Sequence, residues 1–282
     1  MAKEIKKVGI VGAGFTGKQI AAQAALHDFI VYVYDIDAKV VEDAKKYISG
    51  VLKRKNRMDV IQNVLYCTEL DKALEDVDLV VEAVPENLEL KKNIFSQIDS
   101  IAPAHTIIGT NSSSYPVSKI ESTVKRKDKV LNLHFYPPIP TRPMVDIMAG
   151  SETSEETFEK GKKWIRDIQC EPLVVKKECL GFVFNRIWHA AKKECLKIWD
   201  GGHADIETVD TAWKIFTGMK MGPFTTMDGI GLDVVYAVEM SYYNESGNPS
   251  DKPPDAFKEM VEKGDLGMKT GKGFYTYRRR KK

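Results

Sequence analysis

Short apolar runs alternate with longer helical patterns through the first half of the chain. Five runs have the length and the β-branched content of strands: Val8–Val11, Ile30–Tyr34, Leu79–Val84, Thr106–Thr110 and Val130–Phe135. Strands that alternate with helices and are themselves almost wholly apolar are typical of a parallel sheet covered by helices on both faces. The pattern therefore predicts an α/β fold with a doubly wound, mostly parallel sheet.

The hydrophobic period changes near Gly181. Beyond it, glycine and proline breaks separate three segments with helical spacing, at 182–198, 206–219 and 234–243. We therefore expect an N-terminal domain over 1–180 and an all-α domain over 181–282. Within the first domain, the charged stretch at about 38–66 is expected to be a helical insertion that projects from the body of the domain.

Composition changes this picture little. The 282 residues suffice for two domains. The net charge is only +2, from 42 basic and 40 acidic side chains, so no overall field favours nucleic acid or a membrane surface as partner. The basic tail at 278–282 is read as a solvated end, and no metal site is expected.

Cysteine usage and the N-terminus bear on the compartment. Four cysteines lie far apart without CxxC pairing and are read as reduced thiols. The first residues lead into a short apolar run broken by glycines, which is neither a signal sequence nor a membrane span. Both observations favour the cytoplasm.

A glycine-rich loop follows the first strand directly and opens an amphipathic helix. In Gly12-Ala13-Gly14-Phe15-Thr16-Gly17, the first glycine suits a tight turn, the second a close backbone approach to a pyrophosphate, and the third close helix–strand packing. The helix N-terminus would present free N–H groups to the phosphates. Strand, loop and helix together predict a Rossmann-type dinucleotide-binding domain.

The next strand ends at Asp35, where an acid is expected to accept hydrogen bonds from the ribose hydroxyls of the adenosine. The same carboxylate would repel a 2′-phosphate, and Asp37 adds a second negative charge nearby. The sequence therefore favours NAD over NADP.

Polar residues follow three further strands. Val84-Pro85-Glu86-Asn87 and Asn111-Ser112-Ser113-Ser114 stand at strand ends, and a third strand carries His134, with Asp146 further along. Ligands bind at this edge of an open α/β sheet. A histidine can take the hydroxyl proton of an alcohol while hydride leaves for a nicotinamide, and a carboxylate on its other ring nitrogen would fix the tautomer. The pattern predicts alcohol oxidation.

Seven motifs in order resemble the L-3-hydroxyacyl-CoA dehydrogenases over nearly the whole chain: 12–17, 84–87, 111–114, 134–136, 181–186, 221–224 and 272–275. The resemblance implies NAD-dependent oxidation of an L-3-hydroxyacyl-CoA, or the reverse reduction, as in fatty acid metabolism. It implies His134 as general base, Asp146 as its partner, and Ser113 with Asn185 near the substrate oxygen. It also implies a homodimer formed by the α domain. The expected cofactor residues are Gly12, Gly14, Phe15, Thr16, Gly17, Asp35, Ala83, Val84, Glu86, Lys91 and Asn111.

Three positions depart from the family pattern. Asp146 stands where Glu is usual, so its bond to the histidine is expected to need a backbone shift or a bridging water. Pro137-Pro138 replaces Asn-Pro beside the base. Arg142 replaces an apolar residue. It is expected either to bind a carboxylate of the substrate or to be an exposed loop arginine.

The basic stretch from Lys53 to Arg57 has two readings. Lys53-Arg54-Lys55 with Arg57 lies where the family contacts the nucleotide end of coenzyme A, so it could bind phosphate. A solvated helix face fits the same residues. Lys53 and Arg142 are therefore predicted as candidate contacts to the substrate.

Two other functions stay open. The first is oxidation of a free 3-hydroxy acid by the same chemistry, a hypothesis that Pro137 and Arg142 favour. The second is an NAD-binding protein without turnover, against which Ser113, His134 and Asn185 argue.

Overall fold

The computed structural model describes residues 4–277, so the basic tail at 278–282 lies outside the described residues. The chain divides into two compact units, Met1–Val183 and Phe184–Lys282. Each unit is described by itself below.

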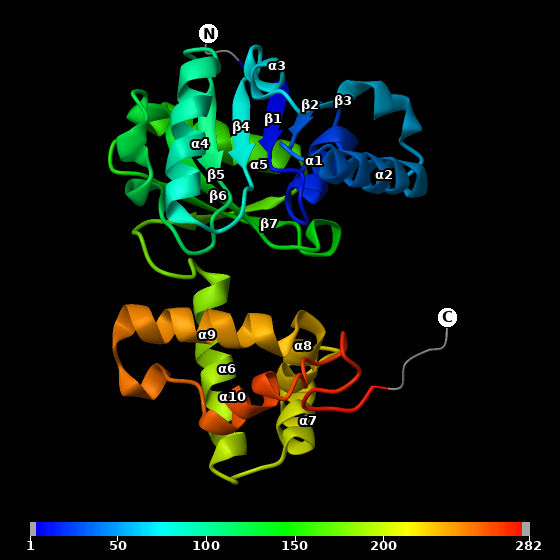
Figure 1. The fold of residues 1–282 in the computed structure, drawn as a ribbon, viewed down its shortest axis with the longest axis vertical. Coiled ribbons are helices and arrows are strands. Elements are labelled where there is room, and N and C mark those ends of the chain that lie inside the picture. The colour runs from blue at the N-terminus through cyan, green and yellow to red at the C-terminus, as the bar shows by residue number, and fades with distance from the viewer. Residues whose placement is uncertain (1–3, 278–282) are drawn as a thin grey trace. The chain divides into compact units, whose positions relative to one another are not determined.

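The first unit is built on one eight-stranded sheet with the strand order β3-β2-β1-β4-β5-β6-β7-β8 (Figure 1). Every neighbouring pair is parallel except β6 with β7, which run antiparallel. The predicted mostly parallel sheet is confirmed. The strands are β1 (Lys7–Val11), β2 (Ile30–Tyr34), β3 (Val64–Cys67), β4 (Leu79–Glu82), β5 (Ile107–Thr110), β6 (Val130–Phe135), β7 (Met144–Ala149) and β8 (Glu171–Val175).

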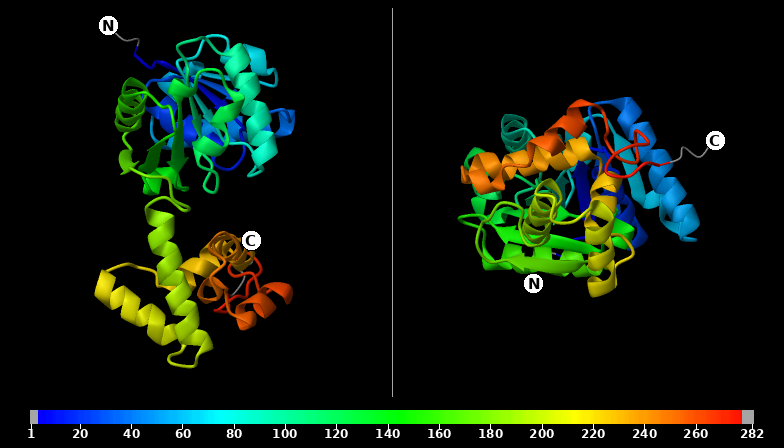
Figure 2. Two further views of the ribbon diagram at one scale, coloured as in Figure 1. Left: turned by 90° about the vertical axis from the view of Figure 1, so that its left-hand side faces the viewer. Right: turned by 90° about the horizontal axis from the view of Figure 1, so that it is seen from below.

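Helices cover both faces of this sheet (Figures 1 and 2). One layer contains α1 (Gly17–Leu26), α2 (Ala38–Arg54) and α5 (Glu155–Asp167), whose apolar residues share a buried core with alternate residues of the strands. The other layer contains α3 (Leu70–Leu74) and α4 (Leu88–Ile101), which belong to a second core. The strand order reverses between β1 and β4, and this switch point is where open α/β sheets bind ligands.

The stretch at 38–66 is not the projecting helical insertion that the sequence predicts. The inner face of α2 is buried against α1, and residues from Val64 onward form β3, which pairs with β2. The segment is therefore the crossover from β2 to β3. Its high charge reflects only the solvent face of a strongly amphipathic helix.

The second unit consists mainly of helices around a small aromatic core. Two of its helices, α8 (Pro223–Ile230) and α10 (Asp255–Glu262), were not expected from the sequence, and each is only eight residues long. The five helices are α6 (Phe184–Asp200), α7 (Ile206–Thr217), α8 (Pro223–Ile230), α9 (Leu232–Ser246) and α10 (Asp255–Glu262). Among residues 4–277, no helix is both long and apolar enough to span a bilayer.

Candidate active site

The glycine loop between β1 and α1 has room for a ligand at one glycine only. Gly12 has φ of +100°, and a Cβ there would lie 2.7 Å from the Ala83 carbonyl oxygen. A Cβ on Gly17 would lie 1.8 Å from the Gly12 carbonyl oxygen, so the start of α1 sits directly on the turn. Around Gly14, by contrast, a Cβ would meet nothing within 4 Å. The open space is where a pyrophosphate would approach the backbone.

Asp35 at the end of β2 holds this loop. One of its carboxylate oxygens accepts a hydrogen bond from the Ala13 amide at 2.9 Å, and the other accepts from the Asp37 amide at 3.1 Å. Each oxygen keeps a lone pair that could accept from a ribose hydroxyl. The loop, the helix start and this carboxylate together fit NAD.

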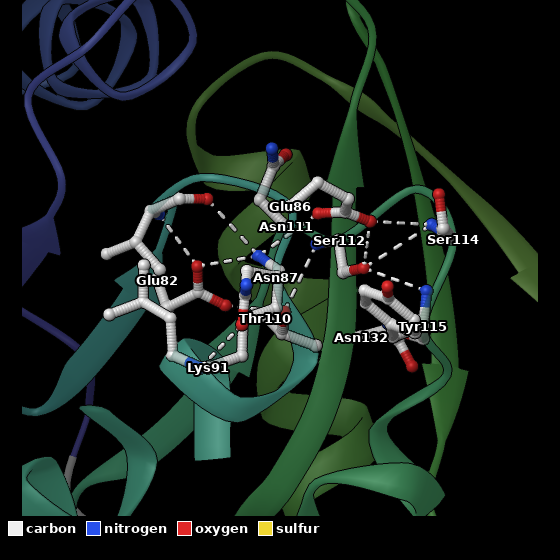
Figure 3. Close-up of polar contacts among 12 residues, drawn as sticks. Glu82, Glu86, Asn87, Lys91, Thr110, Asn111, Ser112, Ser114, Tyr115 and Asn132 are labelled. Atoms are coloured by element: carbon white, nitrogen blue, oxygen red, sulfur yellow. Dashed lines mark hydrogen bonds and ion pairs between the residues drawn. The ribbon is translucent and has the colours of Figure 1, made fainter. Parts of the chain in front are cut away.

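A buried ion pair stabilises the adjacent strand end (Figure 3). Glu82, the last residue of β4, is fully buried and lies 2.8 Å from the ammonium of Lys91, which is 1% exposed. The carboxylate also accepts from the Val84 amide at 2.7 Å and from the Thr110 hydroxyl at 2.7 Å. These bonds compensate the cost of burying two charges and tie β4, α4 and β5 together.

Glu86 joins this network from the loop after β4. It lies 3.2 Å from the Lys91 ammonium and accepts from the Ser112 hydroxyl at 2.5 Å and the Ser114 amide at 2.9 Å. Burial would raise the pKa of Glu86, but the lysine and the two serine hydrogen bonds outweigh it, so the pKa lies below its usual value. Glu86 therefore fixes the loop at 111–114.

The contacts of Lys91 and Asn111 point to structural roles beside the expected cofactor contacts. The Lys91 ammonium already has three acceptors, since it also lies 3.3 Å from the Val84 carbonyl oxygen. The Asn111 side-chain oxygen accepts from the Phe135 amide at 2.9 Å and links the ends of β5 and β6. Phe15 is 69% exposed at the glycine loop, so its ring is free to cover a bound dinucleotide.

His134 and Asp146 face each other across the antiparallel pair β6–β7. They are direct partners in the register, and His134 Nδ1 lies 3.0 Å from Asp146 Oδ2. The carboxylate is fully buried and the imidazole is 6% exposed. A proton on Nδ1 donated to Asp146 leaves Nε2 as the nitrogen that can accept a substrate proton. The pair has the geometry that a general base and an orienting carboxylate require.

Of the two alternatives expected for Asp146, a bridging water or a backbone shift, the direct contact excludes the water. Residues directly opposite in an antiparallel pair have their Cβ atoms about 4.5–5.5 Å apart, which is close enough for the short aspartate side chain. The direct 3.0 Å contact shows that no bridging water is needed.

Two aromatic residues around His134 belong to the motifs recognised in the sequence, but their contacts with the imidazole were not predicted. The Phe182 ring stacks on the imidazole with centroids 4.9 Å apart, and the Tyr136 ring meets it edge-on at 4.6 Å. The Tyr136 hydroxyl donates to Asp146 Oδ2 at 2.5 Å. The alternation along β6 was the available signal for Tyr136, because residues two apart on a strand share a face.

The remaining predicted residues differ in their surroundings. Ser113 is exposed on the loop after β5, and no described residue binds its hydroxyl. Arg142 is exposed and donates to the Pro137 carbonyl oxygen at 3.1 Å, so it braces the loop beside the base. Lys53 is exposed at the end of α2, whereas Arg57 is held by Asp28 and Asp59. Asn185, at the start of α6, belongs to the second unit.

Family comparisons agree with this site. The 3-hydroxyacyl-CoA dehydrogenase NAD-binding domain matches residues 7–179, and the C-terminal domain of the same family matches residues 181–277. The chain belongs to the 3-hydroxyacyl-CoA dehydrogenase family. Its predicted membership, its class as an NAD-dependent oxidoreductase, and its cofactor are thereby confirmed.

Individual relatives cover almost the whole chain. It is 32% identical to the mitochondrial hydroxyacyl-coenzyme A dehydrogenase of Mus musculus over 97% of this chain and 92% of that protein. It is 34% identical to a 3-hydroxybutyryl-CoA dehydrogenase of Clostridioides difficile, over 83% and 82%. The crystal structure of (S)-3-hydroxybutyryl-CoA dehydrogenase from Ralstonia eutropha superposes with a TM-score of 0.91 and 32% identity, over 98% and 100%.

The glycine loop yields a test of its two contrasting positions. Gly14→Ala should leave the free energy of unfolding within about 0.5 kcal/mol of the parent, because the new methyl meets no protein atom. It should weaken NADH binding about tenfold or more, because the methyl occupies the space that the pyrophosphate needs. Fluorescence titration with NADH measures this.

Gly17→Ala is the matched control for folding. Its methyl would overlap the Gly12 carbonyl oxygen, so unfolding should become easier by about 2 kcal/mol or more. If Gly14→Ala binds NADH as tightly as the parent, Gly14 is not the point where the pyrophosphate approaches. If Gly17→Ala is as stable as the parent, close packing at Gly17 is not required.

Proposed function

We propose that this chain oxidises an L-3-hydroxyacyl-CoA to the 3-ketoacyl-CoA with NAD, or catalyses the reverse reduction, with His134 as the general base. The observation that carries the proposal is the buried His134–Asp146 pair, 3.0 Å apart, at the end of β6. Membership of the 3-hydroxyacyl-CoA dehydrogenase family supplies the substrate class.

The residues divide the work of alcohol oxidation. NAD held by the glycine loop and Asp35 would supply the acceptor for the hydride of the carbinol carbon. His134 Nε2 takes the hydroxyl proton, and Asp146 stabilises the imidazolium that forms. The rings of Phe182 and Tyr136 restrict the imidazole, so its orientation is set before substrate arrives.

Further residues are assigned to the substrate. The unpartnered hydroxyl of Ser113 can donate to the substrate oxygen, which carries developing charge during the transfer. Asn185 is also assigned to the substrate, on the strength of the family motif that contains it. Lys53 is assigned to a phosphate of coenzyme A, and its exposure agrees with that role. Arg142 braces the proline loop, so a substrate carboxylate would have to compete for its guanidinium.

The second unit is proposed to make a homodimer in the cytoplasm. Ile215 and Phe216 on α7 are 79% and 93% exposed, and Ile187 on α6 is 62% exposed. Large apolar side chains this exposed are typical of a protein interface. All four cysteines are free thiols, which agrees with a reducing compartment.

His134→Ala tests the base. The oxidation rate, followed as NADH absorbance, should fall about a hundredfold or more, which is the usual contribution of a general base. NADH affinity should not change, because the side chain has no part in the glycine loop. His105→Ala is the control, since His105 precedes β5 at the opposite edge of the sheet. An unchanged oxidation rate in His134→Ala would show that His134 is not the general base.

Phe216→Glu tests the dimer. A charge in place of the most exposed apolar side chain should shift the protein from dimer to monomer in analytical ultracentrifugation. Glu207→Lys, a charge reversal on the first turn of the same helix, is the control that should leave the dimer intact. If Phe216→Glu sediments as a dimer like the parent, the interface does not involve this face of α7.

A further inference from the structure

The Asp146 carboxylate has a second donor besides the histidine. The Tyr136 hydroxyl and His134 Nδ1 both bind Oδ2 of Asp146, at 2.5 Å and 3.0 Å. The other oxygen, Oδ1, is buried, and the residues at 4–277 provide it with no hydrogen-bond partner. The stabilisation of this fully buried carboxylate therefore concentrates on one oxygen, which the phenol and the imidazole share.

We propose that Tyr136 is a positioning residue that sets the pH at which His134 exchanges its proton with the substrate. This inference rests on the proposed function, because it takes His134 as the base. Tyr136 itself does not touch the reacting atoms. It acts through Asp146.

The direction of the effect follows from the shared oxygen. A hydrogen bond to a carboxylate is charge-assisted and stabilises the anion, so the phenol reduces the negative charge that Asp146 offers to an imidazolium. The tyrosine therefore makes the His134–Asp146 pair hold its proton less tightly. Without the hydroxyl, the pair should retain its proton to higher pH.

The neighbouring elements place few other charges near the pair. Opposite Asp146 on β8 stands Leu173, and the turn before α6 contributes the Phe182 ring with the Cys179 thiol behind it. Arg142 binds the Pro137 carbonyl oxygen in the connecting loop. On the β5 side, Asn111 links to the Phe135 amide, and the ionised Glu86 and Lys91 lie beyond it, bound to each other.

The ring of Tyr136 has a separate role from its hydroxyl. It meets the imidazole edge-on at 4.6 Å, while Phe182 stacks on it at 4.9 Å. Tyr136→Phe keeps the ring contact and removes the hydroxyl that donates to Asp146. This substitution separates packing from the proposed hydrogen-bond effect.

The test compares pH profiles of kcat/KM for Tyr136→Phe and the parent in both reaction directions. Oxidation needs an unprotonated base, so its acid limb should move to higher pH by about 0.5–1 unit, which is about a 3- to 10-fold loss on that limb. Reduction needs the imidazolium, so its alkaline limb should move up equally. Rates on the plateaus should stay close to the parent.

The control is Tyr66→Phe, which removes another buried tyrosine hydroxyl, on β3 at the far edge of the sheet. Its two limbs should match the parent. A structural role for the Tyr136 hydroxyl would lower the rates across the whole pH range, with the limbs in place. Such a result would overturn the proposal.

A second variant tests the proposal if Tyr136→Phe folds poorly. With 3-fluorotyrosine at position 136, the phenol is a stronger donor on the same ring, so both limbs should move to lower pH. Unmoved limbs would also overturn the proposal. If His134→Ala remains fully active, the proposed function fails. If His134→Ala is inactive and the Tyr136 limbs do not move, only the role of Tyr136 fails.

Discussion

The reversal of strand direction between β6 and β7 is the constraint on which the active site depends. All other neighbouring strands are parallel, and in a parallel pair the residues that follow a strand end lie beside another strand end. At β6–β7 the end of one strand lies beside the start of the next. His134 therefore stands opposite Asp146, and the connection between them forms the loop beside the base. A one-residue slip in this register would turn the carboxylate to the other face of the sheet.

The rest of the site depends on the parallel part of the same sheet. β1, β2, β4 and β5 end at one edge, so the glycine loop, Asp35 and the Glu82–Lys91 pair gather there although they are distant in sequence. The buried pair and Glu86 hold the loop at 111–114, and Asn111 connects that loop to β6. Hydrogen bonds within the first unit thus connect the residues expected to bind the cofactor with the His134–Asp146 pair.

The sequence predicted those parts whose signal is local. Five strands were recognised by their apolar runs, and the glycine loop by its place between strand and helix. The three missed strands had weaker signals: β3 is an edge strand of four residues, β7 carries a charged residue at Asp146, and β8 begins with Glu-Pro. The 38–66 stretch was misread because charge on one face of α2 hides the buried face that packs on α1.

The site shows the same division. Spacing and family resemblance named His134 and Asp146, but the distance between them depends on strand register, which a single sequence does not reveal. The shared oxygen of Asp146 depends on side-chain direction, so Tyr136 was seen only as part of a motif. Lys91 was named as a cofactor residue, whereas its burial between two glutamates emerges only once β4 and α4 are packed.

The site is proposed to oxidise a coenzyme A thioester. The most direct test is kcat/KM for NADH formation with L-3-hydroxybutyryl-CoA and with the free L-3-hydroxybutyrate, measured side by side. The thioester should be the better substrate by about a hundredfold or more, since contacts to the coenzyme contribute binding energy that the free acid lacks. Equal or higher kcat/KM for the free acid would contradict this proposal.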